Sequence, residues 1–376
     1  MFPAKIYTER LHKAQELAAK RGISAVIVTP GPDFAYLTGS WMSSHERLSA
    51  VVIPATGTVC AVVPATDAFE VHYLSDWGVN VLGWTDGQDP HGLVLEQLSK
   101  HTAETGENQQ DNSAIAVSSA MTADHLLRLQ KLSGKLFVPA NSVLAELFTV
   151  KDSAEIEQLD ACARAIDAVH AQVPALLQPG STENDVAEKL HELILKEHSS
   201  VDFVIVGSGP NGANPHHSHS DRVLEEGDVV VVDLGGTFGV GYHSDCTRTY
   251  IVGGRDKASP EVIAAYDVLY AAQLNARELA SPGISAQAVD AAARSVIAEA
   301  GFGEYFTHRT GHGIGLSTHE EPFIMAGNSL ELEENMAFSI EPGIYVPGKW
   351  GMRLEDIVVT TADGIRSLNQ APRELR

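Results

Sequence analysis

Four acidic residues in the C-terminal half of the chain stand in or beside segments of strand-forming residues. Asp233 follows four valines, Asp245 lies in YHSDCTRTY, and Glu341 follows AFSI. The fourth, Glu355, lies in MRLEDIVV, which reads as a strand. An ionised carboxylate in an apolar strand costs several kcal/mol unless a positive charge compensates it. Few cations stand beside these acids in the sequence, so the pattern favours a fold that gathers them around bound metal ions.

The stretch at residues 307–321, THRTGHGIGLSTHEE, supplies nitrogen ligands for such a site. It places His308, His312 and His319 among closely spaced glycines. Glycine lets the backbone approach a ligand closely, and histidine is a common metal ligand and the usual acid or base near neutral pH. This composition is typical of a functional site, and we expect the glycines to leave room for a ligand.

The four carboxylates, taken together with the imidazole of His312, also indicate the kind of metal. Two divalent ions carry four positive charges and would balance the carboxylates, which otherwise repel one another. Such ligands favour manganese, cobalt or iron, with zinc as an alternative, and Mn²⁺ is our first expectation. Paired ions lower the pKa of the water between them and hold a hydroxide ready to attack at neutral pH.

Composition limits the partners and the compartment. The 376 residues favour two domains. With 26 basic and 49 acidic residues the net charge is −23, which argues against nucleic acid or an anionic membrane as the main partner. Three distant cysteines without a CxxC pair favour a reducing compartment. The N-terminus lacks a signal-peptide core and no apolar run has the length of a membrane span, so we expect a cytoplasmic protein.

The first domain is expected over residues 1–149 and has an alternating α/β pattern. The expected strands cover residues 23–29, 48–54, 58–64, 79–84 and 114–118, and helices after the first are expected near 67–74, 93–102 and 123–132. Trp41 and His45, with the charged residues that follow, are the most site-like group in this half. A surface loop is the favoured interpretation for them.

The second domain is expected over residues 150–376, where the character of the chain changes. Asp152 and Glu155 predict a capping box at the start of a long helix. Three more helices are expected from Thr182, from Pro260 and over residues 286–300. The intervening strands are expected at residues 203–206, 229–234, 250–252, 337–340 and 357–360. The order of two helices, strands, two helices and strands hints at an internal duplication, although no sequence repeat supports it.

A glycine pattern at Gly207, Gly209 and Gly212 matches the GxGxxG fingerprint of dinucleotide-binding proteins. That fingerprint must open a helix whose N-terminus takes the pyrophosphate. Here Pro215 and a polar run follow the glycines, so we expect no nucleotide site.

At these residues the chain resembles the pita-bread metallopeptidases, which include methionine aminopeptidase, aminopeptidase P and prolidase. The motifs PHH, DLGG, HSDCTRT, GHGIGLSTHE, SIEPGIY and RLED occur in the order of the family. The first domain looks like that of the prolidase and aminopeptidase P branch. The resemblance implies an α/β N-terminal domain of the creatinase/prolidase type and an α+β pita-bread catalytic domain.

The resemblance also implies residue roles. In the family, the second aspartate and the last glutamate bridge both metal ions, which here would be Asp245 and Glu355. Asp233 would bind one ion, and His312 and Glu341 the other. Glu341 matches a proton shuttle. His216, His308 and His319 match positions that contact substrate or the tetrahedral intermediate, and Arg353, grouped with the substrate-binding positions, matches an arginine that orients carboxylates.

The implied activity is dinuclear metal-dependent hydrolysis of Xaa-Pro bonds by an Xaa-Pro dipeptidase, with Glu341, His319 and His216 as the catalytic residues. The alternatives are an aminopeptidase P acting on longer peptides and a non-catalytic binding protein on the same fold. Proline-containing dipeptides or short peptides are the expected partners, and the resemblance suggests a homodimer.

Some positions leave the interpretation open. The segment between Asp233 and Asp245 is one residue longer than in familiar relatives, which a bulge in the turn would explain. His217 and His219 are interpreted as solvated loop residues. His243, two residues before Asp245, either supports the site or lies at the surface.

Overall fold

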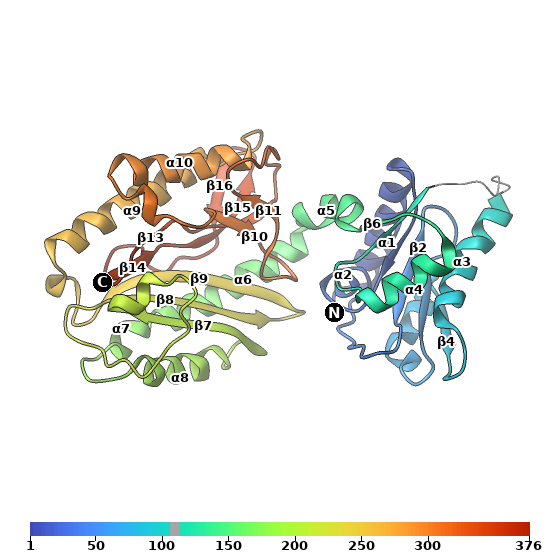
Figure 1. The fold of residues 1–376 in the computed structure, drawn as a ribbon, viewed down its shortest axis with the longest axis horizontal. Helices are drawn as coiled ribbons and strands as arrows, with labels where there is room; N and C mark the ends of the chain where they lie inside the picture. The colour runs from blue at the N-terminus through green and yellow to red at the C-terminus, as the bar shows by residue number, and fades with distance from the viewer. Residues whose placement is uncertain (106–112) are drawn as a thin grey trace. The chain divides into compact units, whose positions relative to one another are not determined.

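The computed structural model describes residues 1–105 and 113–376 and divides into two compact units, Met1–Phe148 and Thr149–Arg376. Figure 1 shows the helices and strands of each unit. Among the described residues, no helix has both the length and the apolar character needed to cross a bilayer.

The first unit is built on a six-stranded mixed sheet in the order β4-β3-β2-β1-β5-β6. Its strands are β1 (Ile23–Val28), β2 (Ala50–Pro54), β3 (Cys60–Pro64), β4 (Asn80–Trp84), β5 (Ala114–Val117) and β6 (Phe137–Pro139). Its helices are α1 (Ala4–Lys20), α2 (Pro32–Thr38), η1 (Ala68–Trp77), α3 (Pro90–Thr105), α4 (Ala123–Ser133) and α5 (Asn141–Thr149). The five predicted strands are confirmed, and β2 and β3 pair as an antiparallel hairpin.

Four elements of the first unit depart from the expectation. The segment predicted as a helix near residues 67–74 is the 3₁₀ helix η1. Helix α2 was not predicted, and Pro32 occupies its first turn, where its missing N–H costs nothing. Short β6 and the adjoining α5 were not predicted, because three or nine residues carry little periodic signal.

The second unit contains two groups of helices, each packed against its own sheet. The helices are α6 (Ser153–His170), α7 (Val173–Leu176), α8 (Glu183–Ile194), α9 (Pro260–Leu279) and α10 (Ala286–Glu299), with 3₁₀ segments η2 (Gly209–Ala213), η3 (Arg255–Lys257) and η4 (Gly303–Tyr305). Helices α6 and α8 pack on the sheet β7-β8-β9, and α9 and α10 contact the strands of the C-terminal half (Figure 1). The predicted capping box at Asp152 and Glu155 is confirmed at the start of α6.

The strands of the second unit form three sheets, ordered β7-β8-β9, β11-β10-β12-β15-β16 and β13-β14. The first group is β7 (Ser200–Ser208), β8 (Val229–Phe238) and β9 (Tyr242–Ile251). The others are β10 (Gly311–Gly313), β11 (Glu320–Ile324), β12 (Ala337–Ile340), β13 (Gly343–Val346), β14 (Trp350–Arg353), β15 (Asp356–Thr361) and β16 (Gly364–Ser367). Strands β10, β11, β13, β14 and β16 were not predicted.

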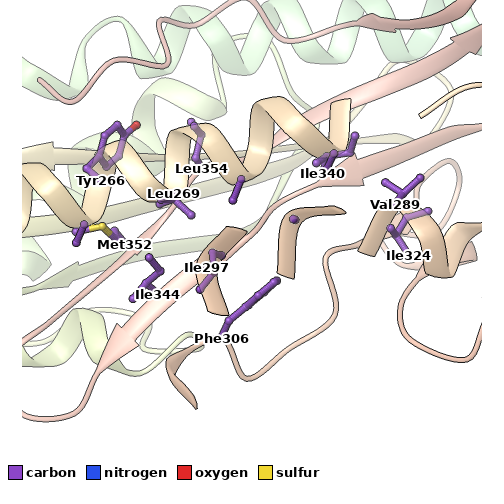
Figure 2. Close-up of a cluster of buried hydrophobic side chains, with 14 of the residues drawn as sticks. Tyr266, Leu269, Val289, Ile297, Phe306, Ile324, Ile340, Ile344, Met352 and Leu354 are labelled. Carbon is purple, nitrogen blue, oxygen red and sulfur yellow. The ribbon is translucent and has the colours of Figure 1, made fainter. Parts of the chain in front are cut away.

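A buried apolar cluster fixes the strands that carry the C-terminal acids. Helices α9 and α10 contribute Leu269 and Val289 to this cluster (Figure 2). Ile340 and Leu354, which directly precede Glu341 and Glu355, are fully buried in it. Because a packed core holds side chains in single rotamers, these two anchors determine where the following carboxylates lie.

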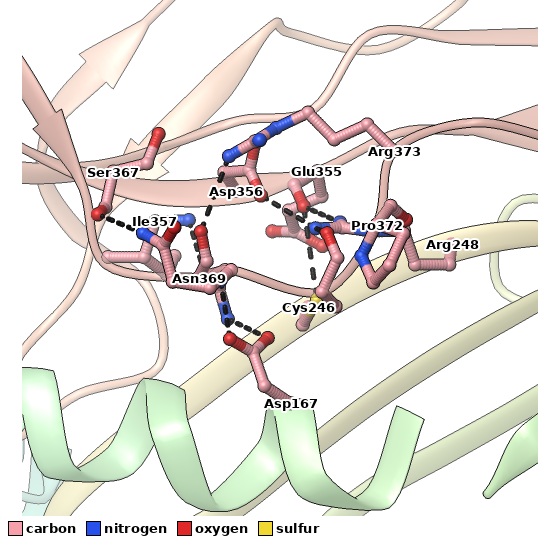
Figure 3. A network of polar contacts seen from close by, with 12 residues as sticks. Asp167, Cys246, Arg248, Glu355, Asp356, Ile357, Ser367, Asn369, Pro372 and Arg373 are labelled. Atoms are coloured by element: carbon pink, nitrogen blue, oxygen red, sulfur yellow. Dashed lines mark hydrogen bonds and ion pairs between the residues drawn. The ribbon is translucent and has the colours of Figure 1, made fainter. Parts of the chain in front are cut away.

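A buried charge network holds the C-terminal segment against the same region (Figure 3). Arg248 lies 2.8 Å from Asp356 and also donates to the backbone carbonyls of Pro372 and Glu355. Asp356 accepts a second ionic hydrogen bond from Arg373 at 2.5 Å. A buried carboxylate is tolerated only when it is paired in this way, so the network fixes the backbone at Glu355 and Asp356.

Candidate metal centre

The hairpin β8–β9 places two aspartates on one face. Asp233 pairs with Thr247, and Asp245 pairs with Gly235, so the two carboxylates lie diagonally on the same side of the sheet. Residues Val232 and Leu234 point the other way into the core under α6 and α8. Asp233 was expected at a strand end, but β8 continues to Phe238 and Asp233 lies within it.

The turn between the two aspartates lies outside the paired ladder. Strands β8 and β9 pair without a register shift from Val229 to Phe238, and the turn consists of residues 239–241. Gly239 and Gly241 have φ values of 57° and 112°, which residues with a Cβ rarely adopt. The ladder is continuous and both aspartates lie within it, while a bulge in the turn as the cause of the longer segment stays a prediction.

Strand β10 brings His312 to the acids. Its Nε2 lies 3.1 Å from Glu341 Oε1 and 3.7 Å from Asp245 Oδ2. The Nδ1 atom lies 3.1 Å from the carbonyl of Gly313, so Nδ1–H donates there and Nε2 is left facing the carboxylates. Glu341 directly follows β12, and its backbone N–H donates to the carbonyl of Thr310 at 2.8 Å.

The glycines beside His312 have a different role from the one expected. A Cβ on Gly311 would lie 1.9 Å from the carbonyl oxygen of Ser339, and one on Gly313 would lie 2.1 Å from that of Glu321. Both contacts are with neighbouring strands of the same sheet. These two glycines thus leave room for backbone, and the expectation that they leave room for a ligand is wrong.

Glu355 completes the group of acids. It was expected inside a strand, but it lies in the two-residue link between β14 and β15. Thr247 Oγ1 donates to Glu355 Oε2 at 2.7 Å, and the Glu355 backbone N–H donates to the carbonyl of Thr247 at 3.2 Å. These contacts leave Oε1 directed toward the other acids without a hydrogen-bond partner among the described residues.

The five residues form overlapping groups that could hold metal ions. Asp233, Asp245 and Glu355 offer oxygen atoms within 4.8 Å of one another, as do ligand atoms of His312, Glu341 and Glu355. A third such group joins Asp245 and His312 to His319. The buried oxygens Asp233 Oδ1 and Glu355 Oε1 have no hydrogen-bond partner in the described part of the chain. Buried polar atoms are normally satisfied, so these oxygens fit a site completed by cations.

The electrostatics agree with that interpretation. Burial raises the pKa of Asp245 well above its ordinary value of 3.8, and the charges of Glu355 and Asp233 raise it further. Burial, followed by the charge of Glu341, likewise raises the pKa of Glu355 well above 4.5. For Glu341, burial acts to raise the pKa, but the hydrogen bond and charge of His312 outweigh it and lower the pKa to about 2. Without metal ions, therefore, the cluster lacks enough positive charge to ionise all its acids.

The histidines predicted to contact substrate lie in three different surroundings. The His319 ring is exposed and lies 4.0 Å from the His312 ring, measured between centroids. Burial, then the His312 charge, lowers the pKa of His319 to about 4. His308 Nε2 lies 2.9 Å from the Tyr345 hydroxyl, and burial lowers the pKa of His308. His216 is exposed on the loop after η2.

Arg353 is buried and makes its hydrogen bonds to protein groups. It donates to Asp233 Oδ2 at 2.6 Å, to the Tyr345 hydroxyl at 2.8 Å and to Thr247 Oγ1 at 3.0 Å. A fourth contact, at 3.3 Å, reaches the carbonyl of Pro215, next to His216. The contacts fit the predicted role of orienting Asp233, and a direct contact of Arg353 with substrate stays a prediction.

One buried residue near the site was not predicted. Glu183, in the first turn of α8, has no exposed surface and accepts hydrogen bonds from Ser208, Asn211 and Ser220. It also accepts one from His217 at 2.8 Å, so the interpretation of His217 as a solvated residue is wrong. Glu183 thereby anchors the loop that carries His216. The sequence offers no sign of this, because an acidic residue in the first turn of a helix is usually solvated.

Two other groups singled out in the sequence lie elsewhere. Gly207 lies at the end of β7, and Gly209 and Gly212 lie within η2, a five-residue 3₁₀ segment that cannot present a helix N-terminus to a pyrophosphate. Trp41 and His45, in a loop of the first unit, line a pocket of about 300 Å³ together with Ser49 and His125.

Comparison with known proteins identifies both units. Residues 157–362 match the model of metallopeptidase family M24, and residues 10–147 match the creatinase/prolidase N-terminal domain. The "probable dipeptidase PepE" of Mycobacterium tuberculosis is 50% identical over 377 residues, covering 100% of this chain and 97% of that protein. The crystal structure of dipeptidase PepE from Mycobacterium ulcerans aligns with a TM-score of 0.93 at 49% identity, covering 100% and 98% of the two chains.

A more distant relative carries a name that specifies a substrate. The "Xaa-Pro dipeptidase" of Lactobacillus helveticus is 34% identical over 346 residues, which cover 91% of each chain. The two family models match residues in both units, and the M24 match at residues 157–362 includes all five proposed ligands. The chain belongs to metallopeptidase family M24, with an N-terminal domain of the creatinase/prolidase type and a pita-bread catalytic domain.

Proposed function

We propose that the protein is an Xaa-Pro dipeptidase that uses two divalent metal ions. The ligands would be Asp233, Asp245, His312, Glu341 and Glu355. The observation that carries this proposal is the pair of overlapping ligand groups, which share Glu355 and contain two buried oxygens without partners. The substrate class is supported by the names of relatives such as the Lactobacillus helveticus enzyme. Manganese is the proposed metal because the ligands are mostly carboxylates.

When bound, the two ions supply a nucleophile at neutral pH and polarise the scissile carbonyl. Side chains carry out proton transfer and position the substrate. Glu341, which stays ionised beside His312, accepts the proton of the attacking water and returns it to the leaving nitrogen. His319 and His216, both exposed, stabilise the oxyanion and position the proline end of the substrate. The raised pKa values of Asp245 and Glu355 are no obstacle, because metal binding displaces protons from its ligands.

Two further properties belong to this proposal. The three cysteines are all buried and form no disulfide with one another, which supports a reducing compartment such as the cytoplasm. The homodimer that the family resemblance suggests is proposed on that resemblance alone.

The substrate assignment is tested with the peptides Ala-Pro and Ala-Pro-Ala, each assayed on the full chain with Mn²⁺ added. A dipeptidase is expected to have a kcat/KM for Ala-Pro at least about tenfold higher than for Ala-Pro-Ala, a difference of about 1.4 kcal/mol in transition-state binding. Preference for the tripeptide would favour an aminopeptidase. Binding of both peptides without cleavage would favour a non-catalytic protein.

A further inference from the structure

An aspartate–histidine pair lies beside the metal centre and has no part in the mechanism above. His243, on β9, places Nδ1 at 2.6 Å from Asp202 Oδ2 on β7. Asp202 Oδ1 accepts a second hydrogen bond from Thr237 at 2.7 Å. Both side chains of the pair are about 85% buried, with 14% and 15% of their surface exposed. A carboxylate that accepts two hydrogen bonds holds an imidazole in one orientation, as carboxylates behind metal-binding histidines do.

The pair holds the loop between β10 and β11. His243 Nε2 lies 3.2 Å from the carbonyl oxygen of Leu316, and its backbone N–H donates to the carbonyl of Gly315 at 3.0 Å. One residue thus secures two successive carbonyls of this loop. At the far end of the loop, Glu320 forms an ion pair with the buried amine of Lys151.

The loop carries His319, which depends on it for its position. No hydrogen bond to the His319 ring is found within residues 1–105 and 113–376, and its close contact is with the His312 ring at 4.0 Å. An exposed ring without hydrogen bonds is placed by its backbone. Movement of the 314–318 segment would therefore displace His319 from the metal centre while leaving the five proposed ligands in place.

We propose that Asp202 and His243 are positioning residues that fix the 314–318 loop and so orient His319 toward the substrate. This inference rests on the proposed function, in which His319 stabilises the intermediate. The sequence left open whether His243 supports the site or lies at the surface, and its ring contacts a loop carbonyl and the Asp202 carboxylate.

Four variants of the full chain test the pair. His243→Asn and Asp202→Asn are expected to lower kcat on Ala-Pro roughly 10- to 100-fold, the range typical of groups that orient catalytic residues. His243→Gln should lose less than about tenfold, because its amide nitrogen can still donate to the Leu316 carbonyl. The control is His191→Asn, an exposed position on α8, which should behave as wild type. Bound metal, measured for every variant, should stay equal to that of wild type.

A double-mutant cycle distinguishes positioning of His319 from general damage. If the pair acts through His319, adding His243→Asn to His319→Ala should lower kcat by less than about twofold. The proposal is overturned if the fold losses of kcat in the two single variants multiply in the double variant. It is also overturned if the loss of kcat in His243→Asn is explained by a lower metal content.

A structural readout keeps the inference testable even if Ala-Pro is not a substrate. Hydrogen exchange of peptides covering residues 314–319 should become at least about tenfold faster in His243→Asn and Asp202→Asn, while residues 337–346 exchange as in wild type. Unchanged exchange in the loop overturns the positioning role. Absence of wild-type turnover, with faster loop exchange in the variants, would contradict the proposed function only.

Discussion

His312→Ala is expected to lower kcat on Ala-Pro by a factor on the order of 10³ or more, because loss of a ligand removes several kcal/mol of transition-state stabilisation. His312 is the one imidazole in the proposed set of five ligands, and its Nε2 lies within 4 Å of both Glu341 and Asp245. The other four ligands are carboxylates, so no neighbouring side chain of the set can replace its nitrogen.

Folding should survive this substitution. His312 lies on a three-residue strand, whereas the apolar clusters that stabilise the second unit lie under the helices. We expect the free energy of unfolding of the metal-free protein to change by about 1–2 kcal/mol. Urea denaturation followed by circular dichroism measures this, with His191→Ala as the matched control. Turnover equal to wild type in His312→Ala would refute the site.

Removal of metal is expected to make the stability of the protein strongly dependent on pH. Folding raises the pKa of Asp245 and Glu355 above the ordinary values of 3.8 and 4.5, so the folded state binds these protons more tightly than the unfolded chain. Their contribution to stability is complete below the ordinary values and is lost as the pH rises through the raised values. Each such group can cost about 1.4 kcal/mol per pH unit within that window.

Divalent ions should reverse the effect, since they replace the displaced protons. The increase in melting temperature caused by Mn²⁺, relative to chelated protein, should therefore be larger at pH 8 than at pH 5.5. Differential scanning calorimetry at the two pH values provides the measurement. In Asp245→Asn the stability of the chelated protein should depend less on pH, because one carboxyl group with a raised pKa has been removed. An equal or larger Mn²⁺ effect at pH 5.5 would contradict this account of the cluster.

The acid cluster could be predicted from sequence because carboxylates rarely occur within strands of apolar residues. Carboxylates at Asp233 and Asp245 interrupt strands of valine and other strand formers, and such an interruption requires compensation. The long helices could be predicted for a related reason, since α6 combines a capping box with a regular apolar stripe. Both signals are local, and both survive in the folded structure.

The supporting residues could not be predicted, because their roles arise from contacts between distant segments. Glu183 and His217 are 34 positions apart, and Asp202 and His243 are 41 apart. Gly311 and Gly313 looked like residues that admit a ligand, yet they admit the backbone of adjacent strands. Strand pairing of this kind is decided by the whole sheet, and three-residue β10 has no periodic pattern that would reveal it.

The central claim, a site for two metal ions, is tested most directly by counting them. Metal-free protein would be titrated with Mn²⁺ by isothermal calorimetry, and the bound metal per chain confirmed by elemental analysis after gel filtration. We predict two ions per chain for wild type and fewer than two for Asp245→Asn. Binding of one ion or none by the wild-type chain, or an unchanged stoichiometry in Asp245→Asn, would contradict the assignment.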